Sequence, residues 1–182
     1  MVDGSSADLR RLARLYADIA FFRRGPEDVP FSQRAFAVTL LAYGLLGLVF
    51  NAALPVSTGN YGALILLDSL LGLAWYWVVL KLARRPERFL QTACAVFGFQ
   101  AVLQPGFSLA TWLFLRYMKD PVWQAPASLL LLALALWTLA VTARILRSAT
   151  GWSQFASVSM VLLQALVIRA LELAILPGTT AA

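Results

Sequence analysis

Five long runs of apolar residues, almost free of charge, constrain this chain more than any other feature. A helix needs about 20 apolar residues to cross a hydrocarbon layer of about 30 Å. Only 13% of the 182 residues are charged, whereas a soluble domain uses about a quarter. The sequence therefore predicts an all-α fold, a polytopic membrane helix bundle with five transmembrane helices. The predicted spans cover residues 33–55, 61–82, 89–118, 125–147 and 152–176.

The third run is longer than one crossing requires and contains Pro105-Gly106. Proline removes a backbone hydrogen bond and collides with the preceding turn, so a kink is expected. If the run were split, residues 107–118 would form a helix of about 18 Å, which is too short to cross. We therefore predict one span, kinked at Pro105. A re-entrant segment is the alternative.

Residues 1–32 are predicted to form a cytoplasmic amphipathic arm ahead of the membrane domain at 33–177. Ser5-Ser6-Ala7-Asp8 has the form of a helix start, and Gly25-Pro26 has the form of a helix end. Apolar residues recur between them at steps of three and four: Leu9, Leu12, Ala13, Tyr16, Ile19 and Ala20. This pattern is typical of a helix in the headgroup plane. A helix docked on the cytoplasmic ends of the spans, or on a partner, explains it equally well.

Lysine and arginine are distributed unevenly between the two sides of the predicted spans. Twelve fall in the arm or in the connections between spans two and three and between spans four and five. Only Arg116 and Lys119 fall on the opposite side. Because positive residues stay in the cytoplasm, we expect a cytoplasmic N-terminus and a periplasmic C-terminus, with 178–182 as a short outer tail. Thirteen arginines against two lysines suggest a GC-rich bacterial genome, and hence the bacterial inner membrane.

A set of polar residues falls in the outer half of the predicted spans. A charge at that depth costs a few kcal/mol unless it faces protein or water and has a partner. We expect Asp68 and Arg169 to approach each other across spans two and five, with Glu172 as a second acceptor. The set comprises Asp68, Arg169, Glu172, Gln104 and Asn51. It could be a structural ion pair, a pocket for water or substrate, or, least simply, a catalytic centre.

Composition narrows the possible partners. The chain has no histidine, which excludes imidazole metal sites and histidine-based triads. The net charge of +6 lies beside apolar runs and not on a soluble basic face, so we expect anionic headgroups of the bilayer as the counter-charge and not nucleic acid. We expect no metal and no cofactor. The arginines expected to contact the membrane surface or a partner are Arg10, Arg11, Arg14, Arg23, Arg24, Arg84 and Arg85.

The order of five spans after a polar segment, with almost no outer loops, resembles the Yip family (Ypt/Rab-interacting membrane proteins and their bacterial relatives). The likeness is best over 137–168, where Trp137-Thr138-Leu139-Ala140 leads through Ala143-Arg144-Ile145-Leu146 to a short turn with Gly151 and a last span. The resemblance implies a membrane-shaping or partner-binding role without enzyme activity. We therefore expect a non-enzymatic scaffold or accessory subunit that binds a protein partner or a second copy of itself. The alternative is a small transporter or transporter subunit whose passage is lined by the outer polar cluster.

Overall fold

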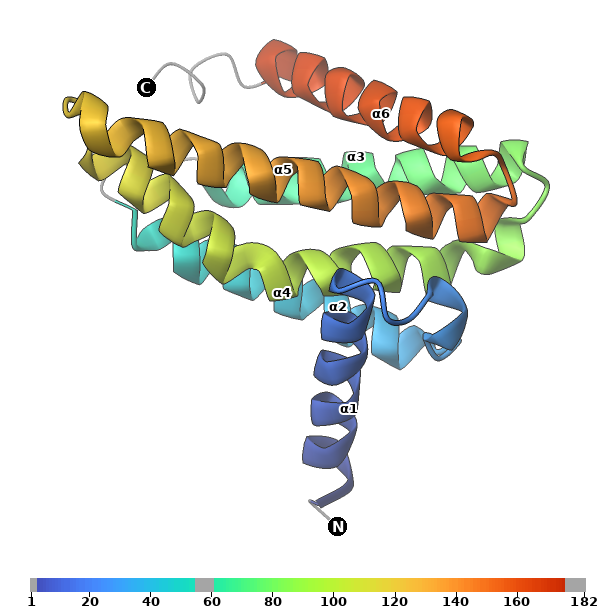
Figure 1. Ribbon diagram of the computed structural model, residues 1–182. Coiled ribbons are helices and arrows are strands. Elements are labelled where there is room, and N and C mark those ends of the chain that lie inside the picture. Colours follow the sequence, from blue (N-terminus) through green and yellow to red (C-terminus); the bar gives the residue numbers. More distant parts are fainter. Residues whose placement is uncertain (1–2, 55–60, 176–182) are drawn as a thin grey trace.

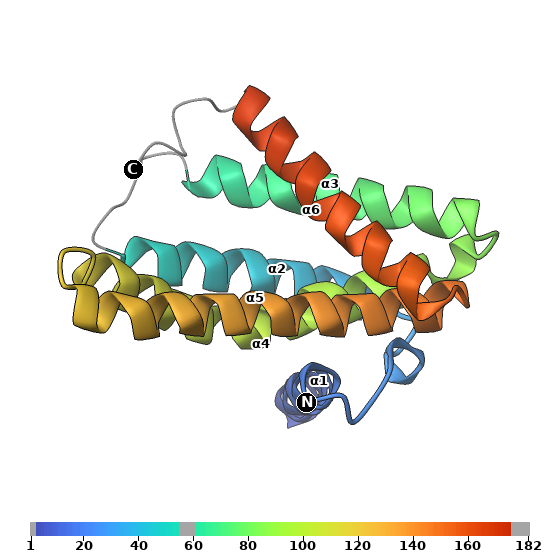
Figure 2. The same cartoon turned by 45° about the horizontal axis from the view of Figure 1, so that its top comes forward.

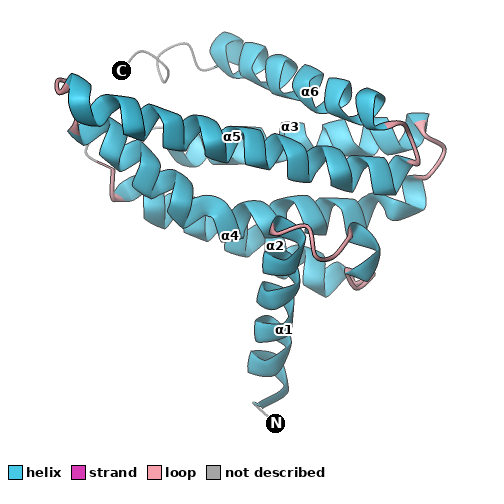
Figure 3. Cartoon of the chain, viewed as in Figure 1, coloured by secondary structure: helices cyan, strands magenta, loops and turns pink. Residues whose placement is uncertain are grey.

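The computed structural model describes residues 3–54 and 61–175, and over these ranges its secondary structure consists of helices joined by short loops, with no strand (Figure 3). Five of the helices are long and apolar enough to cross a membrane, with mean hydropathy between 1.3 and 2.2. The predicted all-α bundle with five candidate spans is thus confirmed, while the tail at 178–182 lies outside the described residues. The elements are α1 (Asp3–Ala20), η1 (Pro26–Asp28), α2 (Gln33–Ala52), α3 (Tyr61–Leu82), η2 (Pro86–Arg88), α4 (Phe89–Arg116), α5 (Pro121–Thr150) and α6 (Gln154–Ile175).

The five long helices run lengthwise beside one another, and α1 runs across them (Figures 1 and 2). Helix α4 packs chiefly against α2 and α5, while α6 rests on α5 and α3. In both views α6 diverges from α5 toward its C-terminal end. The contacts from α2 through α4, α5 and α6 to α3 and back to α2 form a ring, with α3 also touching α4 across it.

Helix α4 is a single helix through Pro105, so the third run forms one span and neither two spans nor a re-entrant segment. Figure 1 shows α4 changing direction near its middle, which agrees with the kink expected at Pro105. Its N-terminal half carries the largest set of buried side chains, many of them small: Ala93, Cys94, Ala95, Gly98 and Ala101. Small residues let backbones approach closely where lipid gives no hydrophobic drive for helix association.

Both ends of α5 differ from the expected 125–147 because local capping extends the helix. The Asp120 side chain accepts a hydrogen bond from the Val122 amide at 3.1 Å, so Asp120-Pro121 begins the helix instead of only breaking the preceding one. At the other end Gly151 adopts a left-handed φ of 76° and donates to the Arg147 carbonyl at 2.8 Å. Left-handed glycine after the last turn is a common helix end. The other spans end within a few residues of their expected limits, and Pro55 lies outside the described residues.

The arm is docked on the bundle by the C-terminal half of α1. Leu15, Tyr16, Ile19 and Ala20 are buried, and the Tyr16 hydroxyl is hydrogen-bonded to Thr39 of α2. Burial raises the pKa of Tyr16 to about 12, so this hydroxyl stays protonated at neutral pH. Of the two alternatives for the arm, docking on the spans is therefore confirmed for this half of α1. The N-terminal half points away from the bundle (Figure 1).

Hydrogen bonds from α5 hold the segment that follows α1. The Trp137 indole donates to the Ala20 carbonyl at 2.8 Å, and Arg144 donates to the Phe22 carbonyl at 2.7 Å. The Phe22 ring packs edge-on against Trp137, with centroids 5.3 Å apart. Further along, the Ser148 hydroxyl donates to the Glu27 carboxylate at 2.8 Å. Helix α1 thus ends at Ala20, before the expected Gly25-Pro26, because this segment is bound to α5.

The close approach of α1 to α4 generates a test of this docking. A Cβ added at Gly98 would overlap the Tyr16 ring, and overpacking of this kind costs about 1–3 kcal/mol. We expect Gly98→Ala to loosen the arm, so that trypsin in detergent cleaves within residues 10–24 about fivefold faster or more. Gly106→Ala is the matched control on the same helix, since its Cβ would lie 3.9 Å from Leu134. Equal cleavage rates for the two variants would contradict the docking.

Candidate functional site

A cavity of about 560 Å³ lies between α3, α4, α5 and α6 and is open on one side, where exposed Leu136 and Leu162 line it. Its volume is within the range of about 300–1,000 Å³ that small-molecule sites occupy. Half of its lining is apolar, as expected for a membrane domain. The polar half runs from the C-terminal end of α6 to the middle of the bundle and comprises Asp68, Tyr76, Gln100, Thr138, Thr142, Gln164, Arg169 and Glu172.

The charged end of the cavity is formed by α6. Arg169 donates to Glu172 at 3.4 Å, one turn along the same helix face. The Arg169 side chain is 57% exposed, whereas that of Glu172 is 14% exposed. At 1.5 Å per residue, Arg169 lies about 9 Å from the end of α6 at Ile175. Its long side chain can therefore reach toward the membrane surface while its charge is offset by Glu172.

Asp68 of α3 has a different partner from the one expected. It accepts a hydrogen bond from the Tyr43 hydroxyl of α2 at 3.0 Å, and the ion pairs among the described residues do not include Asp68 with Arg169. A direct Asp68–Arg169 ion pair is thus not formed, although both residues line the same cavity, as their expected approach requires. Glu172, the expected second acceptor, is the residue that pairs with Arg169, one turn away on the same helix.

The aromatic neighbours of Asp68 fix its position. The Tyr43 ring packs edge-on against Phe97 of α4, with centroids 5.1 Å apart. Phe97 also lies against Gly72, one turn beyond Asp68, where an added Cβ would be 3.5 Å from its ring. Gly72 thus allows α4 to come close, as a small residue on a span should, and Phe97 packs against both Gly72 and the Tyr43 ring that binds Asp68.

The middle of the cavity holds polar groups with incomplete hydrogen bonding. Gln164 of α6 donates to the Tyr76 hydroxyl at 3.0 Å. Within the described part of the chain, Gln164 Oε1 and Thr138 Oγ1 are buried without a hydrogen-bond partner. Buried polar atoms almost always have a partner, in protein or in ordered water. The cavity is large enough to hold such water or a small polar ligand.

Two residues of the predicted polar set lie outside this cavity. The Asn51 side chain donates to the Gly47 carbonyl of its own helix at 2.8 Å. Gln104 of α4 lies on the other side of the same glycine, where an added Cβ would be 3.3 Å from its amide nitrogen. The cavity thus brings together Asp68, Arg169 and Glu172 of the predicted set, while Asn51 and Gln104 lie near Gly47 of α2. Equal depth along a span does not bring residues to the same side.

The predicted surface arginines lie on the arm, whose helix α1 crosses the bundle away from its ends (Figure 1), and on the connection from α3 to α4. Arg24 is paired with Asp18 at 3.6 Å. The Arg85 guanidinium lies over Gly151, where an added Cβ would be 3.3 Å from it. Arg10, Arg11, Arg14 and Arg23 are exposed.

The sequence analysis singled out neither Tyr43 nor Tyr76, because tyrosines near the ends of spans are expected at the membrane interface. Tyr76 is instead 2% exposed and bound to Gln164 inside the bundle. A signal was available for Tyr43, because it lies eleven residues into its span from Ser32, far from either interface where tyrosine is expected. For Tyr76, near the end of α3, the pattern gave no such signal.

Comparison with known proteins finds no matching family model, no similar curated protein and no similar solved structure.

Proposed function

We propose that this chain is a non-enzymatic integral protein of the bacterial inner membrane that acts as a scaffold or accessory subunit of a membrane assembly. The observation that carries the proposal is the arm. Four hydrogen bonds from α4 and α5 hold the segment from Ala20 to Val29 in place, while the first half of α1 projects from the bundle with exposed arginines (Figure 1). A fixed, charged projection of this kind provides a surface for a protein partner.

We propose further that the arm faces the cytoplasm and the C-terminus faces the periplasm. The excess of twelve basic residues over two supports this orientation. An alkaline phosphatase fused after Ala182 is expected to be active, because this enzyme folds only in the oxidising periplasm. A fluorescent or β-galactosidase fusion at the same position should be the less active reporter. The reverse pattern would contradict the orientation.

We also propose that the chain belongs to the five-span Yip-like group. Two of the residues that carry the resemblance, Trp137 and Arg144, are the α5 residues that bind the arm. A family motif that holds a cytoplasmic arm in place is consistent with a partner-binding role.

The assembly proposal is tested by the mass of the purified protein. In mild detergent, light scattering coupled to size exclusion should give a protein mass above the 19.9 kDa of one chain. Arg10→Glu with Arg23→Glu reverses charge on the exposed arm, and we expect it to shift most of the protein to the mass of a single chain. Lys119→Glu is the control, because it changes an exposed cation at the opposite end of the bundle. A wild-type protein that always runs as one chain would contradict a scaffold role.

A second candidate function, a small transporter or transporter subunit, is favoured by the cavity. Its polar lining continues from Glu172 to Thr142 along the bundle, and includes two carboxyl groups and one guanidinium. Side chains of this kind inside a membrane commonly mark solute or proton paths.

The transporter candidate predicts that Asp68→Asn abolishes proton flux in proteoliposomes loaded with a pH-sensitive dye. Asparagine keeps the shape of the side chain and an oxygen that can accept from the Tyr43 hydroxyl, but it does not take up or release a proton. Asp120→Asn is the matched control, because Asp120 is exposed and asparagine caps a helix as well as aspartate does. Flux that survives Asp68→Asn, or is lost equally in both variants, would remove this candidate.

A further inference from the structure

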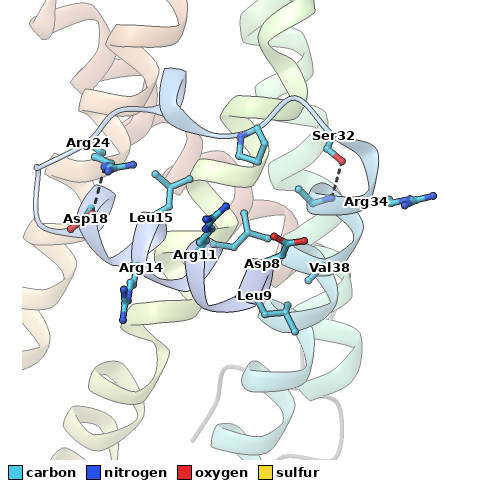
Figure 4. A pocket seen from close by; sticks show the side chains of 13 residues that line it. Asp8, Leu9, Arg11, Arg14, Leu15, Asp18, Arg24, Ser32, Arg34 and Val38 are labelled. Atoms are coloured by element: carbon cyan, nitrogen blue, oxygen red, sulfur yellow. Dashed lines mark hydrogen bonds and ion pairs between the residues drawn. The ribbon is translucent and has the colours of Figure 1, made fainter. Parts of the chain in front are cut away.

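A second cavity, of about 1020 Å³, lies in the angle between α1, the first turns of α2 and the segment at 21–32 that joins these two helices (Figure 4). We call residues 21–32 the returning segment. It is separate from the intramembrane cavity and shares no residue with it. Four arginines and two aspartates line it, which leaves a local charge of +2. These residues are Arg11, Arg14, Arg24, Arg34, Asp8 and Asp18.

The positive charge is only partly offset within the protein. Arg24 is paired with Asp18 at 3.6 Å. Arg11 and Arg34 make no ion pair with any of the residues that the structure describes. Figure 4 shows the Arg11 side chain pointing into the space enclosed by α1 and the returning segment, while Arg14 points away from it. The cavity therefore offers unpaired guanidinium groups to an anion.

The other side of the cavity is apolar. Leu9, Leu12, Leu15, Ala35 and Val38 complete its lining. In Figure 4 the labelled Leu9 and Val38 lie on the side toward which α2 continues, Arg11 and Arg24 lie beneath the returning segment, and the Arg34 side chain points outward from the first turn of α2, away from Arg11. The cavity is thus amphipathic, with its charged and apolar parts separated along the direction of α2.

An exposed apolar stripe extends from this cavity along α2. The steps of three and four residues place its members on one face of the helix. They are Val38 (39% exposed), Leu41 (65%), Leu45 (61%), Leu48 (44%) and Val49 (64%). Helix α2 has 20 residues and is about 30 Å long, equal to the hydrocarbon thickness. Its first turn, which carries Arg34, therefore lies at the headgroup level.

We propose that this cavity binds one anionic diacyl phospholipid, with its phosphate at Arg11, with Arg34 adding positive charge at the edge of the cavity, and with an acyl chain along the stripe that begins at Val38. A free phosphate would leave Leu9, Val38 and the stripe without a partner. A zwitterionic lipid would bring a cation close to unpaired arginines. An anionic lipid satisfies both parts of the cavity, because guanidinium groups bind phosphate oxygens in bidentate geometry.

The test counts lipids retained by the detergent-purified full chain in native mass spectrometry, with phosphatidylglycerol and phosphatidylcholine added at equal concentration. We expect retention of phosphatidylglycerol over phosphatidylcholine, and about tenfold weaker retention in Arg11→Gln with Arg34→Gln, since each arginine near a headgroup contributes appreciably to binding. Arg11→Lys with Arg34→Lys keeps the charge and should restore much of the binding.

Arg10→Gln with Arg23→Gln is the matched control, because it removes two exposed arginines of the arm that do not line the cavity. We expect it to retain phosphatidylglycerol as the wild type does. Equal loss in this control would show diffuse attraction to the charged arm and overturn the proposal. Equal retention of phosphatidylcholine, or displacement of the lipid by millimolar inorganic phosphate, would overturn it as well. These outcomes do not depend on the mass measured for the assembly, so the two proposals fail separately.

Discussion

The close packing around the N-terminal half of α4 is the interaction on which the rest of the structure depends. Within a bilayer, apolar side chains gain little by leaving lipid for protein, so helices associate through packing and hydrogen bonds. Ala93, Cys94, Ala95 and Gly98 have little or no side chain, and α4 therefore admits α2, α5 and α1 at short distance. The same half of the helix receives both the spans and the arm. The level at which α1 crosses the bundle follows from Gly98, which leaves room for the Tyr16 ring.

The positions of the helices along the chain could be predicted from the sequence, but their rotation about their own axes could not. Apolar runs report length, and length alone separated one span from two in α4. The partner of Asp68 depends on which face of α3 meets α2, and a span that is apolar all round carries almost no signal for this. Asn51 and Gln104 were grouped with Asp68 because of their depth, yet they lie against Gly47 on another side. The start of α5 was missed because Asp120-Pro121 both ends one helix and caps the next.

The two cavities contain the same types of charged residue but differ in how far the protein itself pairs those charges. Inside the bundle, each charged group that lines the cavity has a partner: Arg169 has Glu172, and Asp68 has the Tyr43 hydroxyl. In the angle below α1, four arginines and two aspartates leave positive charge in excess. Charge in hydrocarbon must be matched within the protein, whereas charge at the surface can be matched by the membrane. Among the described residues, the charges that line the cavity between the spans are matched within the protein, whereas those that line the cavity beside α1 are matched only in part.

The hydrogen bond between Trp137 and the Ala20 carbonyl joins residues 117 positions apart, and this separation sets an order of events during synthesis. The arm leaves the ribosome first, but its binding site on α5 does not exist until the fourth span has been made. At about 5–20 residues per second, the nascent arm remains without its final partner for on the order of ten seconds. During that time the apolar face of α1 has only lipid or a chaperone to cover it. In the newly made chain, α1 therefore contacts the membrane surface before it docks on the bundle.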